Sequence, residues 1–73
     1  MKKEDITSLA NAYGWESISS NNRVMLSFKR DDWRMNFYYT TGTVTFQSTS
    51  GESKSIKDVV TDELFETILI NQV

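Results

Sequence analysis

The sequence predicts a small α+β protein in two layers, in which helices at the two chain ends cover an antiparallel meander of four or five strands. The main observation is the segment Trp33–Gln47, where large apolar and polar residues alternate on both sides of a glycine turn, a pattern typical of a half-buried β-hairpin. The second observation is helical spacing of apolar residues near both chain ends. A sheet with one apolar face must bury that face, and two terminal helices can cover it. We expect residues 1–73 to form a single domain.

Composition excludes several classes of function. The 73 residues suffice for one core, near the lower limit for folding without a disulfide or a metal. The chain has no Cys and no His, which excludes a thiolate nucleophile, the usual zinc site and the commonest general base. The net charge of −2 does not indicate a nucleic-acid partner. We therefore expect no metal and no cofactor.

The same composition bears on location. No stretch approaches the roughly 18 apolar residues of a membrane span. Met1-Lys2-Lys3 is followed by Glu4-Asp5 instead of an apolar run, which predicts that there is no signal peptide. We expect a cytoplasmic protein without a membrane partner.

The first helix is predicted over residues 3–13. Its apolar positions follow helical spacing: Ile6, Leu9, Ala10 and Tyr13. Glu4 and Asp5 lie in the first turn, where carboxylates suit the helix dipole, and Gly14 is a natural stop. A first strand is predicted at Trp15–Ser19 with Ile18 facing inward. Ser20-Asn21-Asn22 is expected to form a turn, because Asn tolerates the left-handed region.

Two turns set the register of the central strands. A tight turn at Asp31-Asp32 and a second at Thr41-Gly42 place apolar residues on one face. The first turn puts Phe28 opposite Met35, Leu26 opposite Phe37, and Val24 opposite Tyr39. The second puts Tyr39 opposite Val44 and Phe37 opposite Phe46. Phe37 then has apolar partners on both sides, so its strand is predicted to be central.

The last strand and the last helix complete the predicted fold. A three-residue loop, Ser50-Gly51-Glu52, returns a strand over Ser53–Asp58 with Ile56 opposite Phe46. Thr61 is predicted to cap a helix that begins with Asp62 and Glu63. The predicted buried stripe of this helix consists of Leu64, Phe65, Ile68 and Leu69.

The hairpin Arg34-Met35-Asn36-Phe37-Tyr38-Tyr39-Thr40-Thr41-Gly42-Thr43-Val44 resembles the signature of a family of small bacterial, phage and protist proteins. In that family a Gly-Trp start and a Met-x-Ser-Phe-like strand precede the hairpin, and a short basic strand and a Leu/Ile-rich helix follow it. Gly14-Trp15, Met25–Phe28, Lys54–Lys57 and Leu64–Ile70 match these places. The resemblance implies the same fold and a phage or mobile-element origin. It implies no activity.

The sheet face opposite the core carries the candidate binding residues. In the predicted register Lys29 lies across from Arg34, and Met25 lies across from Tyr38. The candidates for partner binding are Met25, Lys29, Trp33, Arg34, Asn36, Tyr38, Gln47 and Lys57.

Two alternatives are open for this face. Lys29 and Arg34 either bind a partner or extend into water, neutralised by Asp31 and Asp32. Trp33 either joins Met25 and Tyr38 as an interface anchor or lies under a helix end as part of the core.

The carboxylates do not indicate a catalytic site. Glu4-Asp5 and Asp62-Glu63 fit first-turn positions of helices, and Asp31-Asp32 fits a turn. We expect a non-enzymatic interaction protein, encoded by a phage or mobile element, that binds a protein partner or a second copy of itself through its open sheet face or edge. The alternative is binding of single-stranded nucleic acid on the same face.

Overall fold

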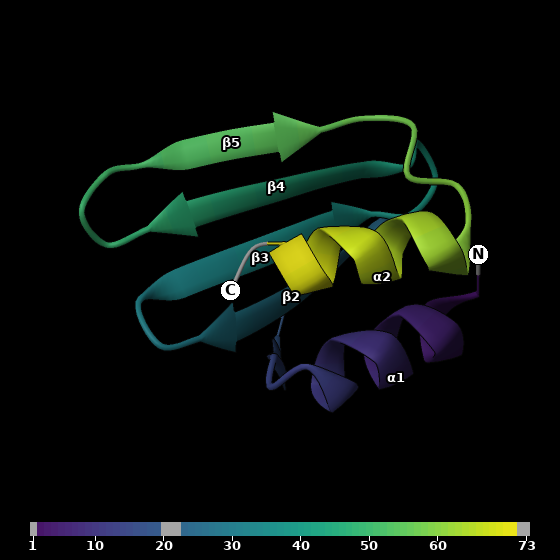
Figure 1. Ribbon diagram of the computed structural model, residues 1–73, viewed down its shortest axis with the longest axis horizontal. Helices are drawn as coiled ribbons and strands as arrows, with labels where there is room; N and C mark the ends of the chain where they lie inside the picture. The colour runs from purple at the N-terminus through teal and green to yellow at the C-terminus, as the bar shows by residue number, and fades with distance from the viewer. Residues whose placement is uncertain (1, 20–22, 72–73) are drawn as a thin grey trace.

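The chain folds as helix, five-stranded antiparallel sheet, helix in a computed structural model that describes residues 2–19 and 23–71 (Figure 1). In chain order the elements are α1 (Lys3–Ala12), β1 (Glu16–Ile18), β2 (Met25–Arg30), β3 (Trp33–Tyr38), β4 (Thr43–Ser48), β5 (Ser53–Ile56) and α2 (Asp62–Asn71). The strands follow one another across the sheet as a meander with β3 in the middle. The predicted α+β two-layer architecture is confirmed. The turn predicted at residues 20–22 lies outside the described residues.

Helix α1 ends in a Schellman motif, which explains the position of Gly14. Gly14 has φ +87°, and its N–H donates to the carbonyl of Asn11 at 3.1 Å. The N–H of Trp15 reaches back to the carbonyl of Ala10 at 3.0 Å. The chain therefore turns sharply and inserts Trp15, only 1% exposed, into the core.

The β2–β3 hairpin has the predicted register. Phe28 pairs with Met35, Leu26 with Phe37, and Met25 with Tyr38. Asp31, the first residue of the turn, has φ +53°, a conformation that Asp tolerates better than most residues. The predicted Val24–Tyr39 pair lies outside the strands, and Val24 is 39% exposed.

The next two registers differ from the prediction by two residues. Phe37 pairs with Val44 instead of Phe46, and Ile56 pairs with Val44 instead of Phe46. The β3–β4 loop spans residues 39–42, so it is longer than the predicted turn. A shift of two residues keeps every side chain on its predicted face, because strand side chains alternate with a period of two. The last strand also ends at Ile56, before the predicted Asp58, because Asp58 adopts φ +62°.

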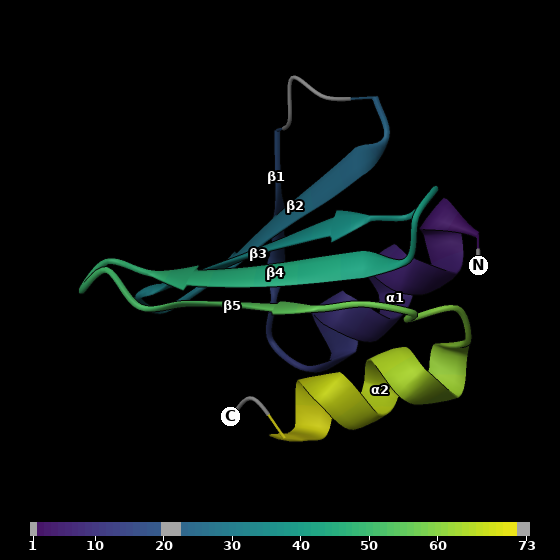
Figure 2. The same cartoon turned by 90° about the horizontal axis from the view of Figure 1, so that it is seen from above.

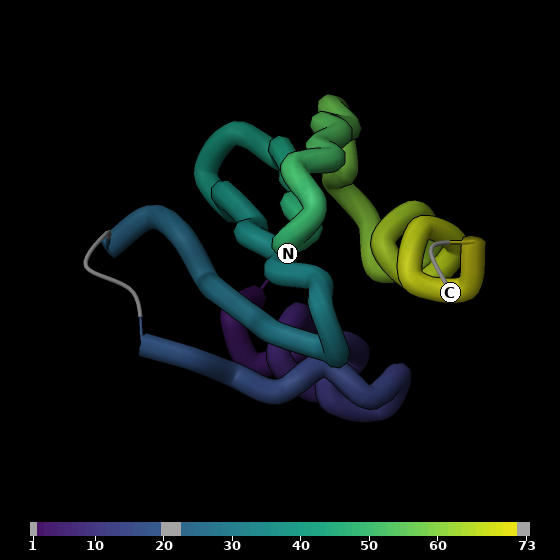
Figure 3. The backbone as a smooth tube through the Cα atoms, turned by 90° about the vertical axis from the view of Figure 1, so that its left-hand side faces the viewer, coloured from purple at the N-terminus to yellow at the C-terminus, as the bar shows by residue number. Residues whose placement is uncertain are grey.

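The core lies between the sheet and the two helices, and both helices lie on the same side of the sheet (Figure 2). Its buried apolar residues are Ile6, Ala10, Trp15, Phe28, Met35, Phe37, Val44, Phe46, Val59, Phe65 and Leu69. Phe65 of α2 meets Phe37 of the central strand edge to face, with ring centroids 4.8 Å apart. Figure 3 shows α2 end on, beside the sheet that it covers.

Arg30 closes the core at the end of β2. Its guanidinium lies over the ring of Trp15, 4.8 Å from the centroid, and its Nη1 donates to the carbonyl of Tyr13 at 3.0 Å. These contacts join the end of α1 to the sheet. The indole N–H of Trp15 is buried without a hydrogen-bond acceptor among the described residues.

Helix α2 begins as predicted, but its buried stripe is narrower. Thr61 Oγ1 accepts a hydrogen bond from the N–H of Leu64 at 3.2 Å, which confirms the cap. Phe65 and Leu69 are buried and Ile68 is half-buried, whereas Leu64 is 46% exposed. The prediction for Leu64 is therefore wrong. It lies on the flank of the helix, beside the position that faces the sheet.

The prediction for Ile18 is also wrong. Ile18 pairs with Ser27, and Ser17 pairs with Phe28. Because directly opposite residues point to the same face, Ser17 shares the core face with Phe28 and Ile18 points to the other face. The reason is the burial of Trp15, two residues before Ser17, which sets the alternation of this strand.

Candidate functional site

The sheet face opposite the helices is the candidate site, because no helix of the described chain covers it (Figure 2). We call it the open face. The paired registers assign its residues: Glu16, Ile18, Met25, Ser27, Lys29, Arg34, Asn36, Tyr38, Thr43, Thr45, Gln47, Ser53 and Ser55. They fall into three rows that cross the strands, and each row has its own chemistry.

The first row is apolar. Met25 lies directly opposite Tyr38, and Ile18, at the β1 end of the neighbouring row, lies diagonally across from Met25. All three side chains are half-buried, so part of each is accessible from the open face. Tyr, Met and Ile side chains gathered in this way can bury an apolar group, and the tyrosine hydroxyl adds a hydrogen-bonding group.

The middle row is polar from β2 to β5, and Ile18 of β1 lies at its end, directly opposite Ser27. Ser27 Oγ donates to Asn36 Oδ1 at 2.9 Å, and Ser27 is only 6% exposed. Thr45 and Ser55 continue the row on β4 and β5. The hydrogen bond satisfies two polar groups on the sheet and fixes the asparagine side chain between the other two rows.

The third row carries the charges. Lys29 and Arg34 lie directly opposite each other and are exposed. Glu16 lies on the other side of Lys29, and Gln47 lies on the other side of Arg34. Two like charges in adjacent cross-strand positions destabilise a sheet slightly, and an opposite charge next to them offsets part of this effect. An acidic group of a ligand placed next to Lys29 and Arg34 would offset the positive charge that remains.

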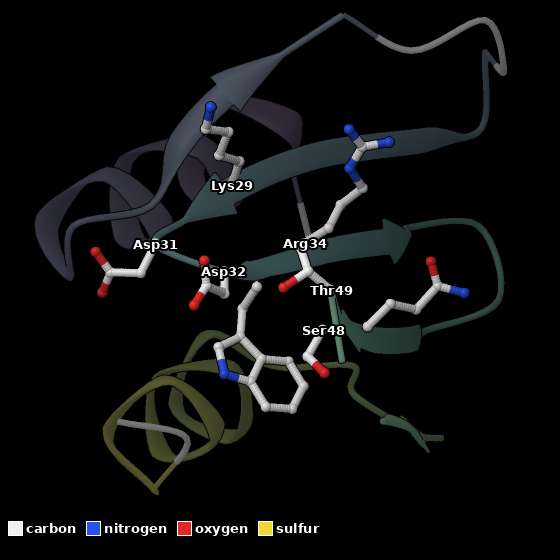
Figure 4. A pocket seen from close by; sticks show the side chains of 8 residues that line it. Lys29, Asp31, Asp32, Arg34, Ser48 and Thr49 are labelled. Atoms are coloured by element: carbon white, nitrogen blue, oxygen red, sulfur yellow. The ribbon is translucent and has the colours of Figure 1, made fainter. Parts of the chain in front are cut away.

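This row borders a surface pocket of about 360 Å³ at the β2–β3 turn. Asp31, Asp32 and Thr49 line the pocket together with Lys29 and Arg34. Figure 4 shows Lys29 and Arg34 extending to one side of the sheet, whereas the carboxylates of Asp31 and Asp32 point away from them. The N–H of Thr49 donates to the carbonyl of Asp32 at 3.0 Å and holds the turn against the end of β4. The carboxylate directly across from Lys29 is therefore Glu16, and the turn carboxylates have a different orientation.

The structure brings together six of the eight predicted binding residues: Met25, Lys29, Arg34, Asn36, Tyr38 and Gln47. Trp33 pairs with Arg30 and Ser48 on the opposite, core face, where it is half-buried against the core. This is the second of the two alternatives for Trp33. Lys57 is exposed just after the end of β5, so it lies at the border of the open face.

Sequence reasoning missed Glu16 and Ile18. Both belong to β1, which has only three residues and no alternation that can be recognised alone. The available signal was Trp15: if it is buried, alternation puts Ser17 inward and both Glu16 and Ile18 outward.

Comparisons of the chain with protein-family models, with curated proteins and with solved structures find no match. The resemblance of the hairpin to a family of small proteins therefore stays a prediction. Among the described residues, no group of three or more His, Cys, Asp or Glu side chains could hold a metal ion. None of the helices described here is long and apolar enough to cross a membrane.

Proposed function

We propose that this chain is a small non-enzymatic binding module that holds a protein partner on its open face. The observation that supports this proposal is the order of the three rows. Half-buried Met25 and Tyr38 stand at one end, exposed Lys29 and Arg34 stand at the other, and a hydrogen-bonded polar pair lies between them. Apolar anchors beside charged groups are the composition of protein interfaces.

The spacing of the rows suggests what the partner presents. Met25 and Lys29 are both on β2, four positions apart, so their side chains are separated by about 13 Å along the strand. A partner segment that lies along β2 and β3 would carry an apolar group at one end and a carboxylate about 13 Å away. Ser27 and Asn36 would face the backbone between these groups.

Single-stranded nucleic acid is the second candidate, because Lys29 and Arg34 could contact phosphates while Tyr38 stacks on a base. Two observations favour a protein instead. Glu16 lies directly across from Lys29 and repels phosphate, and the net charge is −2. Tyr38 also has the aliphatic Met25 directly opposite it, so this row offers one aromatic ring instead of several.

A capture experiment with matched variants tests the proposal. Tagged wild-type protein, Tyr38→Ala and Arg34→Ala are used to capture partners from a lysate of the producing cells, after circular dichroism has shown that each variant is folded. Ser8→Ala, at an exposed position of α1 on the opposite layer, is the control. We expect one or more proteins that are captured by wild type and Ser8→Ala and lost with both face variants. Identical recovery with all four proteins would refute the proposal.

Fluorescence anisotropy distinguishes the two candidates. Labelled single-stranded DNA and RNA are titrated with the protein at low salt. We expect flat titrations. Binding that weakens steeply with salt and is lost in Arg34→Ala would favour nucleic acid instead. The phage or mobile-element origin and the cytoplasmic location stay predictions of the sequence.

A further inference from the structure

Two helices are too narrow to cover five strands. A helix is about 10 Å wide and neighbouring strands lie about 4.8 Å apart, so each helix covers about two strands. Helix α1 packs on β1 and β2, and α2 lies beside α1 with Phe65 on the central strand. Strand β5 is left at the uncovered end of the layer (Figure 1). Its Ile56 points to the helix side and is nevertheless only half-buried.

The flank of α2 that faces β5 is apolar. Glu66 lies on the other flank, because it accepts a hydrogen bond from Tyr13, the residue that follows α1. Successive helix residues are separated by about 100°, so Leu64 and Ile68 lie on the flank away from α1. Leu64 is 46% exposed and Ile68 is half-buried. Ile56, Leu64 and Ile68 form what we call the apolar strip, which runs beside β5.

The outer edge of β5 offers unused backbone groups. Ser48 N–H donates to the carbonyl of Glu52 at 2.9 Å, so Glu52 directs its backbone polar groups toward β4. Hydrogen-bonding direction alternates along an antiparallel strand, so Lys54 and Ile56 also bond to β4. Ser53, Ser55 and Lys57 then point their N–H and C=O groups to the outer edge, where the described residues provide no neighbouring strand.

We propose that a second copy of this chain pairs with β5, in an antiparallel arrangement centred on Ile56. Lys54 and Ile56 point to the helix side, and this arrangement brings Lys54 across from Asp58 of the other copy, so the segment Lys54–Asp58 is self-complementary in charge. Each Ile56 faces the Ile56 of the other copy, and each Lys54 lies across from Asp58 of the other copy. Apolar and opposite-charge cross-strand pairs both stabilise a sheet, and a two-fold axis repeats them.

The backbone bonds of this pairing come from Ser55 and Lys57 alone, so the left-handed Asp58 does not interrupt them. The two apolar strips then border one shared groove. The open face is not covered by this pairing and points to the same side in both copies. The inference is therefore separate from the proposed partner of the open face, and each can fail without the other.

Sedimentation velocity over a concentration series tests the pairing. We expect wild type to dimerise, with the dissociation constant raised about tenfold or more by Ser55→Pro and by Leu64→Lys. Proline at position 55 removes an N–H that points to the outer edge and leaves the bonds to β4 intact. Ile70→Lys is the control, because Ile70 is 53% exposed on the same helix but outside the strip. Tyr38→Ala is expected to leave dimerisation unchanged.

A disulfide tests the register, since the chain has no cysteine of its own. Ile56 lies at a non-hydrogen-bonded position of the proposed pair, where Cα atoms are about 4.5 Å apart, within the range for a disulfide. We expect oxidised Ile56→Cys to form a covalent dimer, while Ile70→Cys stays mostly monomeric. A wild-type monomer up to millimolar concentration, a dimer insensitive to Ser55→Pro and Leu64→Lys, or equal crosslinking at both positions would each overturn the proposal.

Discussion

The carbonyl oxygen of Gly42 accepts a hydrogen bond of 2.8 Å from the backbone N–H of Val59. This bond joins the β3–β4 loop to the segment that leads from β5 into α2. Gly42 has φ +73°, and a Cβ atom there would lie 3.1 Å from the Val59 oxygen and 3.3 Å from Val60 Cγ1. A side chain at residue 42 would therefore require the Val59 backbone to move by a few tenths of an ångström and would hold a left-handed backbone that glycine adopts most easily.

Gly42→Ala is therefore expected to be much more destabilising than Gly51→Ala. Gly51 also has a positive φ, +95°, but a Cβ there would meet nothing within 4 Å. Both variants lose about 1 kcal/mol or more from the strained backbone, and Gly42→Ala loses at least about another 1 kcal/mol because backbone must move. Urea unfolding of the two variants measures the difference. Equal losses would show that the loop relaxes without cost.

The pairings of the central strand β3 with β2 and with β4 show which parts of the fold the sequence could predict. Phe37 is 1% exposed and Tyr38 is half-buried on the open face, as the alternation of β3 requires. The β2–β3 pairing was predictable because a tight turn at Asp31-Asp32 allows one register that aligns the apolar residues. The β3–β4 pairing was not, because a shift of two residues also aligns them and only the loop length separates the two.

The residues of the candidate site were predictable wherever alternation along a strand decides which face they occupy. The residues on β2, β3 and β4 follow from alternation once Phe37 is inside. Trp33 obeys the same parity and belongs to the core face. Apolar character alone predicts that Ile18 and Leu64 belong to the core, but their positions are decided by Trp15 and by the limited width of the helix layer. Both causes are tertiary contacts between distant parts of the chain, and the local sequence pattern does not reveal them.

Truncation of neighbouring residues on α2 tests the narrow buried stripe. Phe65 is fully buried against Phe37, so Phe65→Ala is expected to cost about 3–5 kcal/mol. That is a large fraction of the stability of a small domain, and we expect a substantial unfolded population. Leu64→Ala, at the exposed neighbouring position, is expected to cost less than about 1 kcal/mol. Thermal and urea unfolding measure both. Similar losses would place Leu64 inside the core.

Removal of the N-terminal cap of α2 is expected to lower stability by a smaller amount, and a conservative substitution at the same position is expected to restore it. Thr61→Ala removes the oxygen that accepts from the N–H of Leu64, and it is expected to cost about 1 kcal/mol. Thr61→Ser restores an acceptor and should recover most of the loss in urea unfolding. If Thr61→Ser is as unstable as Thr61→Ala, the threonine acts through its methyl group instead of its hydroxyl.

The contact between the two helices predicts a loss of stability in alkali. Tyr13 donates its phenolic proton to Glu66 Oε2 at 3.1 Å, and this hydrogen bond, together with desolvation and the carboxylate charge, raises the pKa of Tyr13 above its ordinary value of 10.0. The folded state thus holds the proton more tightly than the unfolded state. The resulting stabilisation is complete below pH 10.0 and is lost as the pH rises from there through the pKa of the folded state.

Urea unfolding of wild type and Tyr13→Phe at about pH 8 and about pH 11 measures this effect, and the phenylalanine variant accounts for lysine titration common to both. We expect the advantage of wild type over Tyr13→Phe to shrink at the higher pH. Glu66→Gln keeps an acceptor but removes the charge, so the phenolate absorbance of Tyr13 should appear at lower pH in that variant than in wild type. An advantage of wild type that is the same at both pH values would mean that Tyr13 contributes by packing alone.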